Sequence, residues 1–139
     1  MATRSRIGII NEDGTVTSVY CHWDGYPSHN GRILSDHYDT DTSVRELLSF
    51  GDLSSLDKKI SPSGDTHTFK EPEEGCCVFY GRDRGEEGSE ASVHKNVDEF
   101  LSDAEMCDYA YLFEANEWFC ARLFGSDRSF KRIHEVTEA

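Results

Sequence analysis

Two pairs of β-rich segments, each joined by a short turn, most constrain the fold of this 139-residue chain. In the first pair, residues 6–10 and 15–22 flank the turn signal Glu12-Asp13-Gly14. In the second pair, residues 109–114 and 117–124 flank Ala115-Asn116. Strands with such short connections pair antiparallel, because a parallel return needs a long crossover. The sequence therefore predicts an antiparallel sheet with a hairpin near each end of the chain.

The segments between the hairpins predict helices and one further strand. Capping signals and apolar spacing indicate helices at residues 32–38, 44–50 and from 97 to about 106. The continuous apolar run at residues 76–80 predicts a central strand, and the glycine-punctuated residues 81–88 predict a loop. The expected fold is α+β: an antiparallel sheet of about five or six strands with two or three helices packed on one face. The length fits a single globular domain over residues 1–139, least defined after about residue 125.

The net charge limits the classes of binding partner, and the cysteine content indicates the cellular compartment. The net charge of −13 repels phosphate backbones and anionic headgroups, so we expect no direct nucleic-acid binding and no membrane association. No apolar run reaches membrane-spanning length, and no signal core precedes the first strand. The odd set of five cysteines, without any CxxC spacing, indicates free thiols in a reducing, cytoplasmic compartment.

Residues 20–27 (YCHWDGYP) are the strongest candidate for a binding site, because they concentrate aromatic and polar side chains at the end of a strand. Aromatic faces stack on planar heterocycles, and tyrosine hydroxyls and carboxylates bond ribose hydroxyls or amino groups. This composition suits a nucleotide-like small molecule. The alternative is that the aromatic residues plug the end of the core while the aspartate caps a turn. The predicted ligand-binding residues here are Tyr20, His22, Trp23, Asp24 and Tyr26.

Arg82 and Arg84 lie between glycines just after the predicted central strand and concentrate positive charge in an acidic chain. Guanidinium groups bind phosphate bidentately, so both arginines are candidate ligand-binding residues, and Arg82 or Arg84 is predicted to meet the phosphate of the same ligand. The alternative is local neutralisation by Asp83, Glu86 and Glu87, in a solvated loop.

Catalytic and metal signals are weak. The chain has no GxSxG elbow, P-loop, dinucleotide fingerprint, HExxH or CxxC pattern, so we predict no catalytic residues, no cofactor and no metal site. His22 and Asp24 form an H-x-D pair with His29, Asp36 and His37 nearby. A metal-dependent hydrolase that uses His22 and Asp24 therefore stays an alternative.

Three stretches carry a resemblance to a known group of proteins: SVYCHWDGYPSHNGRIL (residues 18–34), GDLSSL (51–56) and EEGCCVFYGRDRGEE (73–87). With these, the chain resembles a family of small acidic proteins encoded by tailed bacteriophages. The resemblance spans residues 6 to about 124 and implies a host-takeover or anti-defence factor in the cytoplasm of the infected bacterium. It implies a binding protein more than a catalyst, and it carries over no site residues.

Two functions follow as expectations. The first is a counter-defence protein that sequesters a nucleotide-derived immune signal, including a cyclic one, without converting it. The second is an acidic mimic or protein-protein inhibitor whose carboxylates occupy a basic groove on a host or defence enzyme. Edge strands and the closing hairpin are compatible with a homodimer. The carboxylates considered for the mimic are Asp36, Asp39, Asp41, Asp57, Glu73, Glu74, Glu86, Glu87 and Glu90.

Overall fold

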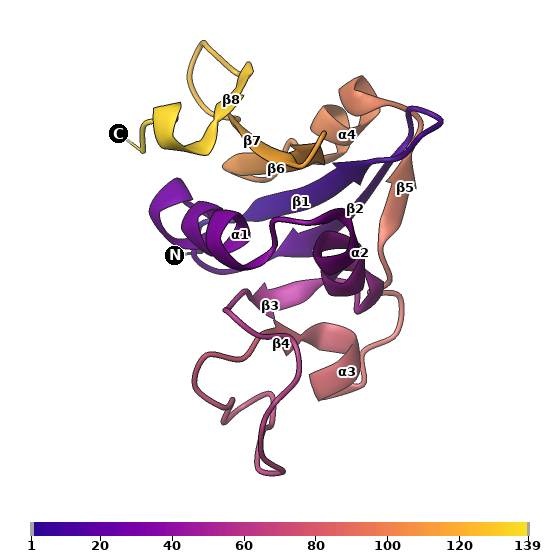
Figure 1. Ribbon diagram of the computed structural model, residues 1–139, viewed down its shortest axis with the longest axis vertical. Helices are drawn as coiled ribbons and strands as arrows, with labels where there is room; N and C mark the ends of the chain where they lie inside the picture. Colours follow the sequence, from indigo (N-terminus) through magenta and orange to yellow (C-terminus); the bar gives the residue numbers. More distant parts are fainter. Residues whose placement is uncertain (1, 139) are drawn as a thin grey trace.

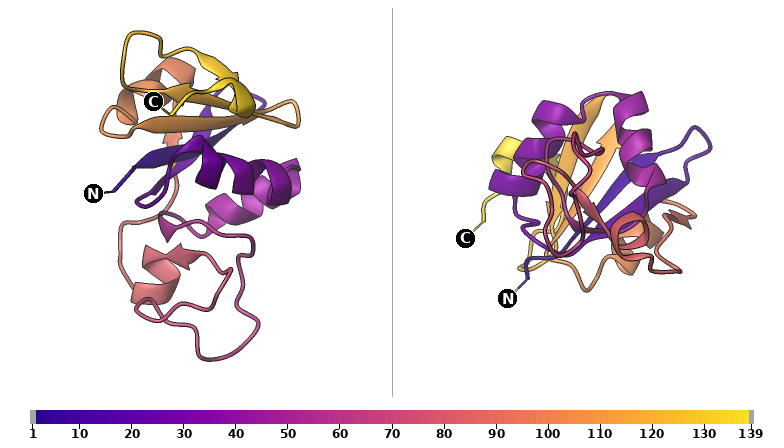
Figure 2. Two further views of the ribbon diagram at one scale, coloured as in Figure 1. Left: turned by 90° about the vertical axis from the view of Figure 1, so that its left-hand side faces the viewer. Right: turned by 90° about the horizontal axis from the view of Figure 1, so that it is seen from below.

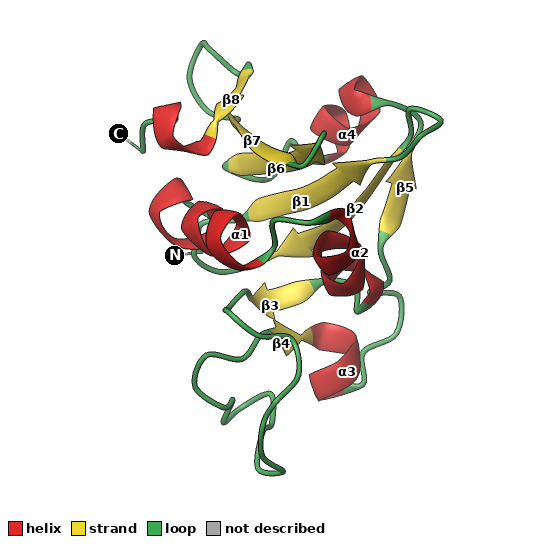
Figure 3. Cartoon of the chain, viewed as in Figure 1, coloured by secondary structure: helices red, strands yellow, loops and turns green. Residues whose placement is uncertain are grey.

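The computed structural model describes residues 2–138 and shows an α+β fold around one mixed, mostly antiparallel sheet (Figure 1, Figure 3). The strands follow the order β4-β3-β2-β1-β6-β7-β8, and β5 also pairs with β2. The class agrees with the prediction, but the eight strands exceed the predicted five or six. Their bounds are β1 Ser5–Ile10, β2 Val16–Cys21, β3 Leu53–Ser55, β4 Val78–Phe79, β5 Ser92–His94, β6 Tyr109–Glu114, β7 Glu117–Arg122 and β8 Phe130–Arg132.

Both predicted hairpins form, and they meet in the middle of the sheet. β1 pairs antiparallel with β2, and β6 pairs antiparallel with β7. β1 and β6 lie side by side in parallel, with Ile7 opposite Tyr111. The long intervening chain allows this parallel contact, because residues 22–108 supply the crossover.

The helices are short and end near the residues that the capping signals indicated. They are α1 Arg32–His37, α2 Asp41–Ser49, α3 Tyr80–Arg84 and α4 Val97–Asp103, with one π-helical turn, η1 Pro27–Gly31, and one 3₁₀ turn, η2 Ile133–Glu135. α2 begins three residues before the predicted start at residue 44, because Thr40 rather than Ser43 is its N-cap and the two side chains form the capping box. No helix within residues 2–138 is both long and apolar enough to cross a bilayer.

Helices cover both faces of the sheet, which differs from the prediction of helices on one face (Figure 2). α1 and α2 bury Leu34, Val44 and Leu47 in the larger core cluster. α4 buries Phe100 on the opposite face, against Val16 and other residues of the smaller cluster. Alternate residues of one strand point to opposite faces, so β2 and β6 contribute to both clusters.

The apolar run at residues 76–80 is not the predicted central strand. It supplies only the two-residue β4, which pairs with β3 at one end of the sheet order. A continuous apolar run reports burial rather than sheet position. Here Cys77 and Phe79 are buried in the main cluster with Leu53 of β3 and with Leu56 and Ile60 of the loop-rich segment 56–76, which projects at one end of the molecule (Figure 2).

The predicted loop at residues 81–88 begins as α3 instead. The carboxylate of Asp83 accepts a hydrogen bond of 2.8 Å from the backbone N–H of Phe79, which satisfies a donor at the start of this short helix. Gly85, with φ of 68°, ends it in the left-handed conformation.

Candidate functional site

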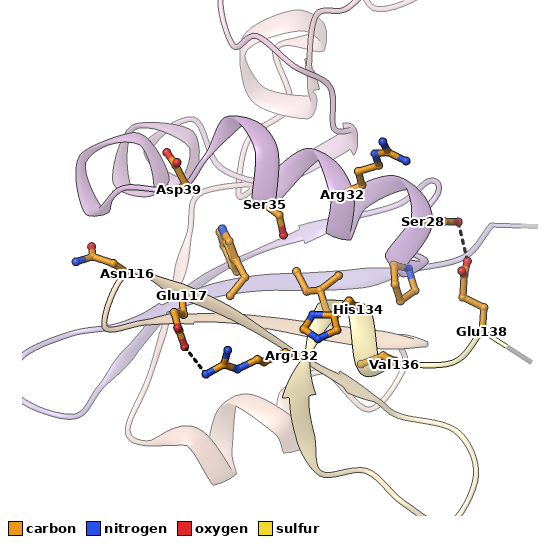
Figure 4. Close-up of a pocket in the computed structure, with 13 residues that line it drawn as sticks. Ser28, Arg32, Ser35, Asp39, Asn116, Glu117, Arg132, His134, Val136 and Glu138 are labelled. Carbon is orange, nitrogen blue, oxygen red and sulfur yellow. Dashed lines mark hydrogen bonds and ion pairs between the residues drawn. The ribbon is translucent and has the colours of Figure 1, made fainter.

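A surface cleft of about 600 Å³ lies between α1, the β6–β7 turn and the C-terminal segment β8–η2 (Figure 4). Its volume falls in the range of small-molecule sites. Its lining residues are Pro27, Ser28, Arg32, Ser35, Asp39, Asn116, Glu117, Trp118, Arg132, Ile133, His134, Val136 and Glu138.

The floor of the cleft is apolar and fixed. Trp118 is 7 % exposed, and its indole Nε1–H donates a hydrogen bond of 2.7 Å to the backbone carbonyl of Tyr38, the residue that ends α1. This bond ties β7 to the end of α1. Ile133 and Val136 pack against the main core cluster from the C-terminal segment. The floor therefore offers an apolar surface to a ligand, supplied mainly by Ile133 and Val136 because Trp118 is largely buried.

The rims carry groups of both charges. Ser35 and His134 point into the cleft in Figure 4, whereas Arg132 lies along one edge, 3.7 Å from Glu117. Arg32 is directed away from the cleft centre in this view and lies 3.7 Å from Asp36. Both ion pairs are long and mostly exposed, and such pairs contribute about 0–1 kcal/mol. An anionic ligand can therefore draw either guanidinium away from its present partner.

Close packing of η1 against the C-terminal segment forms one wall of the cleft. A β-carbon on Gly31 would lie 2.8 Å from Cγ2 of Ile133 and 3.3 Å from the ring of Tyr111, so only glycine fits without displacement. The Ser28 hydroxyl donates a hydrogen bond of 2.9 Å to Glu138. These contacts hold residues 133–138 over the start of α1.

The second half of the predicted binding motif shapes the turn that leads into this wall. Asp24 has φ of 56°, and its carboxylate accepts a hydrogen bond of 3.2 Å from the hydroxyl of Tyr26. The negative charge of Asp24 raises the pKa of Tyr26. The carbonyl of Gly25 accepts a 2.6 Å hydrogen bond from buried Tyr111. Asp24 and Tyr26 thus hold the turn before Pro27, the one motif residue that lines the cleft.

The first half of the motif forms a separate aromatic group. The hydroxyl of Tyr20 is 2.8 Å from Nδ1 of His22, and the rings of His22 and Trp23 meet edge to face at 4.8 Å. Burial raises the pKa of Tyr20 to about 12. Trp23 is 44 % exposed, so it does not plug the core. None of these three residues lines the cleft described above.

The two predicted phosphate-binding arginines are engaged locally. Arg82 bonds Asp83 and the backbone carbonyls of Ile60 and Cys77, and it lies over the ring of Phe79 at 4.8 Å. These contacts pin the loop-rich segment 56–76 to α3, so Arg82 has a structural role.

Arg84 lies over the rings of Phe69 and Tyr80 and pairs with Glu86, as local neutralisation predicts. Within residues 2–138, no hydrogen bond, ion pair or ring contact between either arginine and residues 20–26 is present.

The histidine and aspartate residues considered for a metal do not assemble into a ligand cluster in the described part of the chain. The cluster found there consists instead of His94, Glu99 and Asp103, which sequence reasoning did not select.

Apart from Pro27 and Asp39, the cleft residues were also missed, although the sequence held one signal. Positive charge is concentrated near the C-terminus in Arg128, Lys131 and Arg132, followed by His134, in an otherwise acidic chain. The same argument singled out Arg82 and Arg84. Nothing in the sequence indicated that residues 132–134 would meet α1.

Comparison with models of known protein families, with curated proteins and with solved structures found no match. The resemblance to bacteriophage proteins therefore remains a prediction.

Proposed function

We propose that this protein is a non-enzymatic binding protein that sequesters a nucleotide-like molecule in the cleft between α1 and β8–η2. In the setting that the phage resemblance implies, the ligand is a nucleotide-derived immune signal, and the protein acts in the cytoplasm of the infected bacterium. The observation that carries the proposal is the combination of an apolar floor with cationic and anionic rims in one cleft of about 600 Å³.

Each part of a nucleotide finds a chemical counterpart in this cleft. The apolar floor of Trp118, Ile133 and Val136 suits the face of a base. Arg132 offers charge and hydrogen-bond donors to phosphate, His134 offers a ring nitrogen, and Ser35, which points into the cleft in Figure 4, offers a hydroxyl to the base or ribose.

The net charge of −13 opposes the approach of an anion. Exposed charges are screened beyond a Debye length of roughly 8 Å at physiological salt, so a bound phosphate responds mainly to the charges of the cleft itself: Arg32 and Arg132 on one side, and Asp39, Glu117 and Glu138 on the other. We therefore expect the overall negative charge to lower the association rate more than the final affinity.

Thermal unfolding against nucleotides, cyclic dinucleotides and cyclic ADP-ribose isomers tests the proposal. A ligand at a hundred times its dissociation constant stabilises the folded protein by about 2.7 kcal/mol. The shift should largely disappear in Arg132→Ala and persist in Lys131→Ala, which removes the same charge from the neighbouring residue, outside the cleft.

Two outcomes of this experiment redirect the assignment. A shift that is lost in Trp23→Ala but retained in Arg132→Ala would move the site to the aromatic group Tyr20, His22 and Trp23. No shift with any compound would refute nucleotide sequestration and favour the acidic inhibitor.

Among the carboxylates of the inhibitor's set, the structure engages Glu73, which binds Lys59 and two backbone N–H groups. The pairs Asp41–Arg45 and Glu86–Arg84 are exposed like those of the cleft, so these carboxylates stay available to a partner.

A further inference from the structure

A second cluster of polar side chains lies away from the cleft, where β5 leads into α4. Asn96 caps the helix by accepting a hydrogen bond of 2.8 Å from the backbone N–H of Glu99. Glu99 and Asp103, four residues apart, share one side of α4, and His94 precedes the helix on β5. One ligand atom from each of His94, Glu99 and Asp103 lies within 4.8 Å of the other two.

The imidazole of His94 is held rigidly from behind. It is 2 % exposed, and its Nε2 lies 2.6 Å from the hydroxyl of Ser18 on β2. That hydroxyl also accepts a hydrogen bond of 2.8 Å from Nε of Arg6 on β1. A histidine that ligates a metal through one ring nitrogen commonly donates the other N–H to such a fixed acceptor.

The same contacts do not make a hydrolytic triad. Ser18, His94 and Asp103 follow the order of nucleophile, base and orienting carboxylate, with 2.6 Å on both sides of the ring. Ser18, however, is fully buried and already accepts from Arg6, so a substrate carbonyl cannot reach its oxygen. The accessible side of the ring is the Nδ1 side, where the side chain of Asp103 is 50 % exposed.

We propose that His94, Glu99 and Asp103 form a binding site for a divalent transition-metal ion, of which Zn²⁺ fits best. One imidazole and two carboxylates are ligands that Zn²⁺ accepts, and three protein ligands leave a position for water. With metal–ligand bonds of about 2.0–2.2 Å, ligand atoms lie about 3–4 Å apart, so small movements of the carboxylates close the site.

An imidazole binds a metal through its unprotonated nitrogen, so the N–H of His94 has to lie on Nε2, where the Ser18 hydroxyl can rotate to accept it. Nδ1, which lies 2.6 Å from the carboxylate of Asp103, then binds the ion. The bound ion would connect β5 to α4, so it should stabilise the pairing of β5 with β2 as well.

Absorption spectroscopy with Co²⁺, followed by competition with Zn²⁺, tests this site independently of the nucleotide proposal. We expect a visible Co²⁺ band without the near-ultraviolet thiolate band that cysteine ligands would produce. Zn²⁺ should abolish it and raise the unfolding temperature, and chelator should reverse the rise.

Isosteric variants locate the ion. Glu99→Gln and Asp103→Asn should each weaken Co²⁺ binding by about tenfold or more, and Ser18→Ala by about 10–100-fold, because Ser18 orients the ligand without touching the ion. Asp98→Asn, an exposed position on the same helix, should bind as the unmodified protein does.

Three results would overturn the proposal: no Co²⁺ band, a thiolate band, or equal binding by Asp103→Asn and Asp98→Asn. Circular dichroism of each variant checks that α4 is intact, so a loss of binding reports on the ligands.

Discussion

Replacing Trp118 by phenylalanine should destabilise the protein far more than the same replacement at Trp23. The Trp118 indole is buried, and its N–H is the hydrogen-bond donor to the carbonyl of Tyr38. Trp118→Phe leaves that carbonyl without this donor, at a cost of about 1–3 kcal/mol. The smaller ring also leaves on the order of 40 Å³ of unfilled space, which adds about 1 kcal/mol at about 24 cal/mol per Å³.

The sum, about 2–4 kcal/mol, is below the 5–15 kcal/mol typical of a folded domain, so the variant should still fold. For a chain of this length, about 3 °C is lost for each kcal/mol, so the unfolding temperature should fall by about 6–12 °C. Trp23→Phe is the matched control: Trp23 is 44 % exposed, and its replacement should change stability by about 0.5 kcal/mol or less.

Thermal and urea unfolding, followed by far-ultraviolet circular dichroism, measures both variants without relying on tryptophan emission. Equal, small losses at the two positions would refute the role of the Trp118–Tyr38 hydrogen bond in fixing the cleft floor to α1.

Three further perturbations test the packing and the charges. Gly31→Ala should lower the free energy of urea unfolding by about 1–3 kcal/mol, because the added methyl group overpacks against Ile133. In the control Gly64→Ala, the β-carbon would meet only a flexible side chain at 3.5 Å, so the loss should be smaller. Equal losses would argue against the close approach of Gly31 to Ile133. Burial raises the pKa of the Cys21 and Cys120 thiols to about 12. A thiol reagent at pH 8 should therefore modify these cysteines slowly in the native protein and rapidly in the unfolded protein, and fast labelling of either cysteine in the native protein would contradict the fold. Lys59, with the backbone N–H groups of Ser63 and Gly64, lowers the pKa of Glu73 in the folded protein to about 2. The ionised Glu73 carboxylate therefore stabilises the fold fully above its unfolded-state pKa near 4.5, and this stabilisation is lost as the pH falls from 4.5 towards 2. Glu73→Gln should reduce the pH dependence of the urea unfolding midpoint between pH 4.5 and 2, whereas Glu74→Gln should leave it unchanged. Identical midpoint-against-pH profiles for the two variants would show that Glu73 contributes nothing.

Local signals in the sequence predicted local structure well. The turn at Glu12-Asp13-Gly14, the pair Ala115-Asn116 and the cap at Asn96 each depend on residues within a few positions, and each forms as expected. Ala115 and Asn116 both take positive φ angles, which the tight β6–β7 turn requires.

Long-range arrangement was not predictable from the same signals. Phe100 shows the reason: its apolar spacing predicted a buried helix face but could not say which side of the sheet buries it, and α4 lies opposite α1 and α2. Cys77 and Phe79 of the run at residues 76–80 are buried as expected, yet within residues 2–138 the run pairs with only one strand, β3, and shares its cluster with Leu56 and Ile60 of the loop-rich segment 56–76.

The candidate site was missed for the same reason. Arg132 and Trp118 come together with Ser35 only through tertiary packing, which brings segments about one hundred residues apart to one cleft. Residue chemistry alone favoured the aromatic motif, whose members Asp24 and Tyr26 instead hold a turn.

Retention of an unaltered nucleotide tests sequestration most directly. The protein is incubated with the nucleotide that shifts its unfolding temperature, separated from free ligand by rapid gel filtration, unfolded in denaturant, and the released material is analysed by chromatography and mass spectrometry. The account predicts about one chemically unchanged ligand for each cleft, retained by Lys131→Ala and lost from Arg132→Ala. No retained nucleotide, or release of a converted product, would contradict it.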